Sequence, residues 1–166
     1  MTVRFAVAAL ACAAILFGQT PLTPAQKKML DTIDAAAPDS VALLEKLVNL
    51  NSGSFNPNGV KSVAAIMEAE LRALGFETRY IHQDHMQRAP HLVAERKGRG
   101  GKPLLLIGHM DTVFEPSSPF QKFVRNGRTA TGPGTSDMKG GLVVLLASLK
   151  GLKAAGLIDA MPLKVF

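Results

Sequence analysis

The sequence predicts an α/β domain with a central, mostly parallel sheet that is flanked by helices. Three observations indicate this class: helical periodicity in the first part of the chain, extended segments after residue 75, and a strongly apolar helix before the last extended segment. Helices before and after strands are typical of layered α/β domains. The length of 166 residues fits one domain, and an apolar content of 47% is enough for a packed core.

The first two helices are predicted from their start and stop signals. Thr23 is a suitable N-cap and Pro24 fits the first helical position, so we expect a helix to about residue 37. Pro38 ends this helix, and Asp39 or Ser40 caps a second one, in which apolar residues recur at helical spacing up to residue 50.

The rest of the chain alternates turn chemistry with periodic segments. Residues 51–59 form a loop rich in Asn, Ser and Gly, and a third helix over residues 60–74 closes at Gly75. Residues 104–107, Leu-Leu-Leu-Ile, lack alternation, as expected of a strand covered on both faces. Residues 139–155 form an apolar helix stopped by Gly156. Extended segments are expected at residues 76–83, 91–98, 102–109 and 162–166, with a hairpin over residues 121–132.

The N-terminus has the pattern of a secretory signal peptide. A short cationic region, MTVR, precedes about 14 apolar residues, fewer than the roughly 20 needed for a bilayer span. We therefore assign residues 1–25 to a signal peptide with an approximate end, and expect a periplasmic or secreted protein with no stable membrane span. A single N-terminal membrane anchor, and lipidation at Cys12, the only cysteine, are the alternatives.

The formal net charge of +6 comes partly from one basic cluster, RKGRGGK at residues 96–102. Aromatic residues that could stack on bases are few and are not interleaved with the cluster, so nucleic acid is not an expected partner. A tight, solvated hairpin turn explains the cluster, and an anionic surface site is the alternative.

A histidine and an acid lie two residues apart where the apolar strand ends, in the stretch GHMDT. His109 and Asp111 point to the same side if the strand persists, at the edge where open α/β sheets place their ligand sites. A metal-binding histidine typically donates its other ring N–H to a carboxylate. The pattern suits a metal ligand with its orienting acid, but an ordinary hydrogen-bonded pair also explains it.

A second motif, GPGTSDMKGG at residues 132–141, places Asp137 among four glycines in front of the apolar helix. A helix N-cap is one explanation for this acid, but a cap does not need so many glycines. The surplus indicates backbone that passes close to another group or adopts conformations closed to other residues. A carboxylate held there could bridge two metal ions through its two oxygens.

These motifs resemble those of the dinuclear zinc exopeptidases and deacylases, a family that includes glutamate carboxypeptidase, aminoacylase and succinyl-diaminopimelate desuccinylase. The resemblance covers about residues 43–166 and is most similar to glutamate carboxypeptidase in GRGGKPLLLIGHMDTVF, GRTATGPGTSDMKGG and ASLKGLKAAG. It implies that His109 ligates one zinc, that Asp111 is the carboxylate that orients His109 in the catalytic site, and that Asp137 bridges both zincs. It also implies a cis peptide between Asp137 and Met138.

The resemblance further implies that residues 26–166 are the N-terminal part of a metallopeptidase catalytic domain. In the family, the strand that begins here at Pro162 leads to an acidic pair, whose first glutamate is the general base and whose second is a zinc ligand. A further acidic ligand, a second histidine ligand and a dimerisation domain follow. None of these falls within the 166 residues, so we expect an incomplete domain of poor stability, with at most two of five protein zinc ligands and no activity by itself.

The implied function is hydrolysis of an amide bond with two Zn²⁺ in the complete enzyme, as an exopeptidase that releases a C-terminal amino acid such as glutamate. The expected substrates are small peptides or N-acyl amino acids. A deacylase of N-acyl amino acids is the alternative within the family. A non-catalytic relative that keeps the fold as a binding module is the alternative from another class.

Several other polar residues and two methionines are assigned ordinary structural roles. His82, Asp84 and His85 are interpreted as a solvated turn, and His91 as a strand-edge residue. Met110 and Met138 are expected to pack beneath the site. For Lys139 two interpretations stay open, a solvated charge or a residue that steadies nearby carboxylates.

Overall fold

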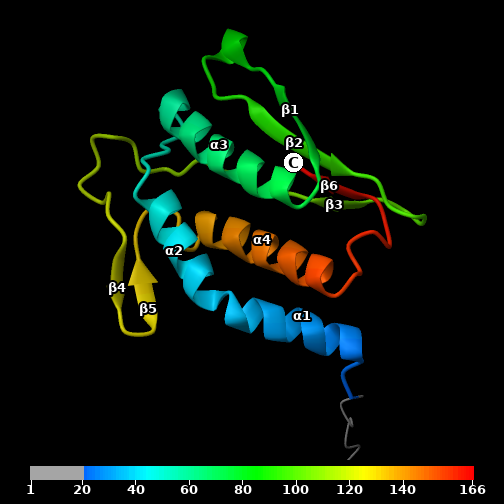
Figure 1. The fold of residues 1–166 in the computed structure, drawn as a ribbon. Coiled ribbons are helices and arrows are strands. Elements are labelled where there is room, and N and C mark those ends of the chain that lie inside the picture. The colour runs from blue at the N-terminus through cyan, green and yellow to red at the C-terminus, as the bar shows by residue number, and fades with distance from the viewer. Residues whose placement is uncertain (1–20) are drawn as a thin grey trace, which may run out of the picture.

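The computed structural model describes residues 21–166, so most of the predicted signal peptide lies outside the described residues. Three helices come first, strands follow them, and a fourth α-helix precedes the last strand (Figure 1). In chain order they are α1 Pro24–Ala35, α2 Ala37–Val48, α3 Pro57–Ala73, β1 Glu77–Ile81, the 3₁₀ helix η1 Asp84–Met86, β2 His91–Arg96, β3 Leu104–Leu106, β4 Val124–Asn126, β5 Thr129–Thr131, α4 Lys139–Ala154 and β6 Leu163–Val165.

The helices follow their capping signals with one correction. Thr23 caps α1 in a capping box with Gln26, as its sequence predicts. Helix α2, however, begins at Ala37 with Ala36 as its N-cap residue, so the prediction that Pro38 ends α1 and that Asp39 or Ser40 caps α2 is wrong. Pro38 lies in the first turn of α2, where the N–H that proline lacks would have no helical partner.

Helix α3 begins three residues earlier than predicted, because Asn56 provides its N-cap. The Asn56 side chain accepts a hydrogen bond from the backbone N–H of Gly59 at 3.2 Å, and Pro57 takes the first helical position. At the other end, Gly75 has a φ of +87°, as expected for the residue that follows a helix.

The α/β class is confirmed, but the expectation of a mostly parallel sheet is wrong for the described strands. The four-stranded sheet has the order β1-β2-β6-β3, and only the pair β3–β6 is parallel. The parallel pair is the one joined by a long crossover that contains α4, whereas β1 and β2 are joined by a short connection and pair antiparallel. Strands β4 and β5 form the predicted hairpin outside this sheet.

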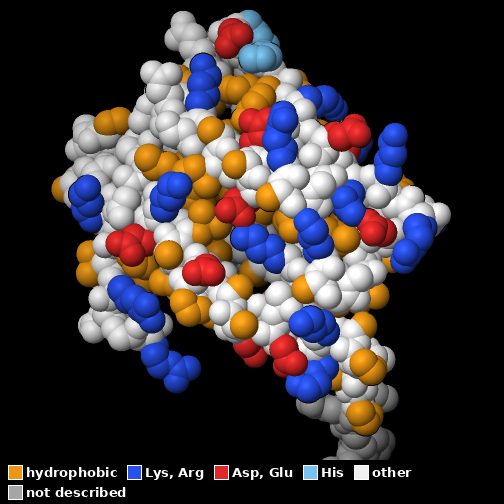
Figure 2. Space-filling model, in the orientation of Figure 1, with side chains coloured by type: hydrophobic (Ala, Val, Ile, Leu, Met, Phe, Trp, Pro, Cys, Tyr) orange, Lys and Arg blue, Asp and Glu red, His pale blue; other side chains and the backbone are white. Residues whose placement is uncertain are grey.

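The basic segment between β2 and β3 is not the hairpin turn that the sequence suggested. Strand β6 lies between β2 and β3, so residues 97–103 cross the end of the sheet. The backbone N–H of Arg99 donates to the backbone oxygen of Asp159 at 2.8 Å, and the Arg96 guanidinium pairs with the Asp159 carboxylate. Lys and Arg side chains gather at this end of the molecule (Figure 2).

The hydrophobic core lies between one face of the sheet and helices α3 and α4. Its buried members include Met67 and Leu71 of α3, Leu146 of α4 and Val165 of β6. Helices α1 and α2 contact α4 and form the outer layer (Figure 1).

The other face of the sheet is exposed along the row formed by Leu105, Lys164 and Glu95, which are paired across β3, β6 and β2. Strand β3 is also the edge strand, and Leu104, Leu105 and Ile107 are 46%, 50% and 66% exposed. The interpretation of this run as a strand covered on both faces is therefore wrong for the described residues, whereas its expected incomplete coverage is confirmed. No helix within residues 21–166 is long and apolar enough to cross a bilayer.

Candidate metal site

The loop before α3 holds the segment that follows β3. The backbone N–H of Thr112 donates to the Ser52 oxygen at 2.8 Å, and that of Ser54 donates to the Thr112 oxygen at 3.0 Å. The Ser52 hydroxyl donates to the backbone oxygen of Met110 at 2.9 Å. Ser52 and Thr112 are buried, so this short ladder fixes the backbone on which the His109 and Asp111 side chains stand.

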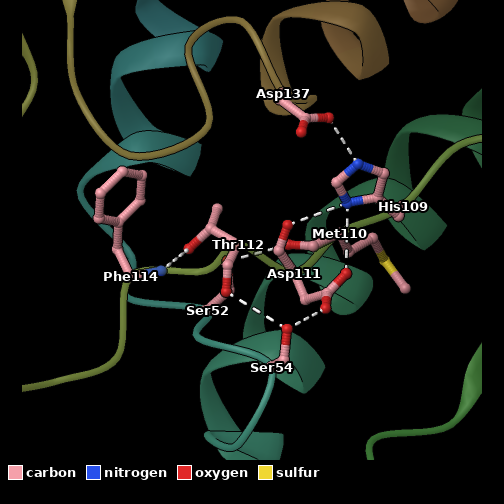
Figure 3. Close-up of polar contacts among 8 residues, drawn as sticks. All are labelled: Ser52, Ser54, His109, Met110, Asp111, Thr112, Phe114 and Asp137. Atoms are coloured by element: carbon pink, nitrogen blue, oxygen red, sulfur yellow. Dashed lines mark hydrogen bonds and ion pairs between the residues drawn. The ribbon is translucent and has the colours of Figure 1, made fainter.

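His109 is held at both ring nitrogens by groups from different parts of the chain (Figure 3). Its Nδ1 lies 3.2 Å from Oδ1 of Asp111 and 3.0 Å from the Asp111 backbone oxygen. Its Nε2 lies 2.8 Å from Oδ1 of Asp137. Both ring nitrogens therefore face acceptors. In the neutral tautomer that keeps its proton on Nδ1 toward Asp111, the lone pair of Nε2 is available to a cation.

Asp137 faces His109 and does not act as a helix cap. The N-cap residue of α4 is Met138, with no side-chain cap hydrogen bond, and the Asp137 side chain is 86% exposed. The N-cap interpretation of Asp137 is therefore wrong. The peptide bond between Asp137 and Met138 is cis, as the family resemblance implies.

Glycine is needed in this turn because its backbone lies close to other parts of the site. Gly134 has a φ of +80°, and a Cβ at that position would lie 3.0 Å from the Thr112 side chain and 3.1 Å from the Lys139 side chain. A side chain at residue 134 would therefore be strained and would push apart the two segments that carry the site.

Ser54 is a site residue that the sequence did not reveal. Its hydroxyl donates to Oδ2 of Asp111, the oxygen on the other side of the carboxylate from His109 (Figure 3). Ser54 lies in a loop whose composition predicts only turn chemistry, and it is 57 residues from Asp111. No local pattern could have indicated this contact.

The His109–Asp111 pair lies between two cavities. One, of about 410 Å³, is lined by Asp137, the glycine-rich turn and the aromatic residues Phe114 and Phe120, whose rings are 4.9 Å apart. The other, of about 380 Å³, has a mainly apolar lining. Ser54, His109 and Asp111 line both, so a molecule in either cavity would lie beside the histidine.

The carboxylates raise the pKa of His109. Partial burial, the largest single influence, lowers this pKa, but the hydrogen bond to Asp137, the bond to the Asp111 backbone and both negative charges together outweigh it. The same charges favour any cation placed against Nε2, so a metal ion would compete with the proton for this position.

Imidazole nitrogen and carboxylate oxygen are donors that suit zinc and other divalent transition metals. Residues 21–166 contain no group of three or more His, Cys, Asp or Glu side chains arranged to hold a metal ion. His109 and Asp137 could therefore hold a metal as two ligands of a larger set, with Asp111 behind the histidine.

The residues given ordinary roles lie away from this site or beneath it. The side chains of His82 and Asp84 are 70% and 76% exposed with 3.8 Å between them, and His85 lies in η1, so they form a solvated turn as predicted. Met110 and Met138 pack against the core, also as predicted. Lys139 is not a solvated charge, because it is fully buried and its Nζ donates to the backbone oxygens of Leu47 and Leu50. His91 begins β2 and lines the cavity of about 380 Å³ together with His109.

Comparison with known proteins defines the class of this chain. Residues 105–166, which carry both motifs, match the profile of Peptidase family M20/M25/M40. The chain belongs to this peptidase family.

Individual relatives agree with this assignment. The chain is 35% identical to Carboxypeptidase G2 of Pseudomonas sp. (strain RS-16) over 94% of its own length and 38% of that protein. It is 32% identical to Succinyl-diaminopimelate desuccinylase of Pseudoalteromonas atlantica over 66% of its own length and 29% of that protein. Its fold is similar to an M20 family metallo-carboxypeptidase, Sso-CP2, of Sulfolobus solfataricus, with a TM-score of 0.63 and 21% identity over 76% of this chain and 30% of that one.

The matched part of the chain spans 38%, 29% and 30% of the lengths of these three proteins. It thus corresponds to part of an M20 peptidase domain, and the α/β fold described above is that part.

Proposed function

We propose that this chain contributes part of the active site of a zinc-dependent exopeptidase of the glutamate carboxypeptidase type, which hydrolyses the amide bond before a C-terminal amino acid such as glutamate. The observation that carries the proposal is the placement of the His109 Nε2 and an Asp137 oxygen 2.8 Å apart, with Nδ1 of the same ring held by Asp111. The 35% sequence identity with Carboxypeptidase G2, over 94% of the chain, supports the reaction type.

In this proposal each residue has a distinct task. His109 and Asp137 would hold zinc, and Asp137, which contacts His109 through one oxygen, would have its second oxygen available. Asp111 keeps the proton of His109 on Nδ1 and so presents Nε2 to the metal. Bound zinc would lower the pKa of water and polarise the scissile carbonyl. The remaining ligands and the general base come from outside residues 1–166, so the chain by itself is inactive.

The substrate is a small peptide or an N-acyl amino acid. The 410 Å³ cavity beside Asp137 is large enough for such a group, and its Phe114 and Phe120 rings offer an apolar wall. A deacylase of N-acyl amino acids is the second candidate, supported by the identity with Succinyl-diaminopimelate desuccinylase. The N-terminal sequence supports export, in a periplasmic or secreted location.

The test is metal binding by the 166-residue chain, followed by the visible spectrum of Co²⁺ as a zinc substitute. We expect weak but saturable binding, because two protein ligands are fewer than the four of a closed zinc site. His109→Ala and Asp137→Ala should abolish it, and Asp111→Asn should weaken it about tenfold, because it removes the negative charge that orients the ring.

The matched control is His85→Ala, which removes a histidine in the solvated turn of η1. It should leave the Co²⁺ titration unchanged. Equal loss of binding in His85→Ala, or full binding in Asp137→Ala, would contradict the proposed ligands and would favour the non-catalytic binding module.

A further inference from the structure

Lys139 is a buried cation with an unusual set of partners. Its side chain is fully buried, and Nζ donates to the backbone oxygens of Leu47 at 2.9 Å and Leu50 at 2.8 Å. Among the described residues no carboxylate pairs with it. Leu47 is in the last turn of α2 and Leu50 follows that helix, so the ammonium group lies at the negative end of the α2 dipole.

These two bonds connect separate parts of the site. Lys139 is two residues after Asp137, at the start of α4, whereas Leu50 leads directly into the loop that carries Ser54. Ser54 donates to Asp111, which holds His109. Residues 47–54 therefore bind both parts of the site. They hold the turn that carries Asp137 through Lys139, and the segment that carries His109 through Ser54.

The packing of the lysine stem supports the same role. The space at Gly134 is bounded by the side chains of Thr112 and Lys139, each within about 3.1 Å of where a Cβ would stand. The stem thus fills the gap between the glycine-rich turn and the segment after His109. Removal of the stem or of its ammonium group would free the turn on the side that faces His109.

We propose that Lys139 is a positioning residue that sets the separation of Asp137 from His109 by fastening the glycine-rich turn to the end of α2. This inference rests on the proposed function, because it assigns to Lys139 a role in forming the metal site. If Lys139 only packed the core, loss of its Nζ hydrogen bonds would weaken metal binding no more than an equal loss of stability caused elsewhere in the chain. A positioning role requires a larger loss of metal affinity than that.

The chain offers a matched control in Lys153. Its Nζ donates to the backbone oxygen of Ala73 at the end of α3 at 2.7 Å, which is the same kind of lysine-to-helix-end bond. Lys153 lies 14 residues after Lys139 on the same helix, about 20 Å away along its axis. Lys139→Met and Lys153→Met remove the ammonium group at each place and keep an unbranched stem.

The experiment measures the Co²⁺ dissociation constant and the denaturant midpoint of wild type and both variants, in the full 166-residue chain. We expect Lys139→Met to bind Co²⁺ about tenfold more weakly with a changed visible spectrum, and Lys153→Met to bind it as wild type does. Leu74→Ala, a core variant at the end of α3 that lines neither cavity, corrects for lost stability. Conversion of Lys139→Cys to thialysine with 2-bromoethylamine, in a Cys12→Ser background, should restore binding.

Wild-type affinity and spectrum in a folded Lys139→Met chain would overturn the inference and leave the proposed function intact. The inference is also overturned if Leu74→Ala, adjusted by denaturant to the same folded fraction, loses as much affinity as Lys139→Met. Failure of the wild-type chain to bind Co²⁺ would instead overturn the proposed function, together with the role of Lys139 that rests on it.

Discussion

At the scale of single residues, the residues of the two motifs were predictable from the sequence, whereas the residues that hold them in place were not. The strand-end position of His109 and Asp111 and the surplus of glycines around Asp137 suggested metal ligands, and the family resemblance joined these three residues in one predicted site. Ser54 and Lys139 could not be found in this way, because their partners are 57 and about 90 residues away in the sequence. Their roles depend on contacts that exist only after α2, α3 and α4 have packed.

A second residue-level feature lies outside the site, where Tyr80 donates a hydrogen bond to Oε2 of Glu68 at 2.8 Å. Burial, and then the hydrogen bond and charge of Glu68, raise the pKa of Tyr80 to about 12. Since the folded chain holds this proton more tightly than the unfolded chain, the associated stability is present below pH 10 and is lost as the pH rises from 10 to 12.

This prediction can be checked directly, because Tyr80 is the single tyrosine and the chain has no tryptophan. Tyrosinate absorbance at 295 nm should rise with a midpoint near pH 12 in the folded chain and near pH 10 in urea. Glu68→Gln should give an intermediate midpoint, because burial is the larger cause. A folded-state midpoint near pH 10 would show that Tyr80 is not held as described.

At the scale of helices and strands, sequence signals located the elements better than they set their limits and partners. Capping chemistry placed the start of α1 correctly. Helices α2 and α3 begin earlier than predicted, because Pro38 lies inside the first turn of α2 and Asn56 caps α3, whereas neighbouring residues also offered suitable starts. The apolar run of β3 suggested a central strand of a parallel sheet. A run of leucines gives no information on pairing, and β3 has one partner, β6, in the described chain.

The exposed edge of β3 leads to a prediction about self-association. Unpaired backbone groups beside Leu104, Leu105 and Ile107 provide a template for another strand, so the 166-residue chain should associate at micromolar concentration in sedimentation velocity experiments. Leu105→Glu should shift the chain toward monomer. The new charge lies opposite Lys164 in the strand pair, and it would disfavour contact with the apolar edge of a second copy.

The control for this prediction is Val144→Glu, which places the same charge at a 65% exposed apolar position on α4. Its sedimentation profile should match that of wild type. If Val144→Glu dissociates the chain equally well, or if wild type is already monomeric, the edge of β3 is not the site of association.

At the scale of the whole molecule, the proposed function depends on two facts, the match to the peptidase family and the partial coverage of its relatives. An α/β fold hosts many chemistries, so the fold alone did not indicate a peptidase. The two motifs, brought face to face by α4 and the loop after α2, carry the assignment. In the proposed account, the described residues bring His109 and Asp137 together as part of a metal site, with Asp111 and Ser54 behind the histidine.

The most direct test of this account is a long-range ¹H–¹⁵N spectrum of the four histidine rings in the zinc-titrated chain. We predict that zinc shifts only His109, with Nε2 taking the chemical shift of a metal-bound nitrogen and Nδ1 remaining protonated toward Asp111. Binding through Nδ1, or a zinc-independent His109 signal with shifts at His82, His85 or His91, would contradict the central claim that His109 and Asp137 form the metal-binding half of this site.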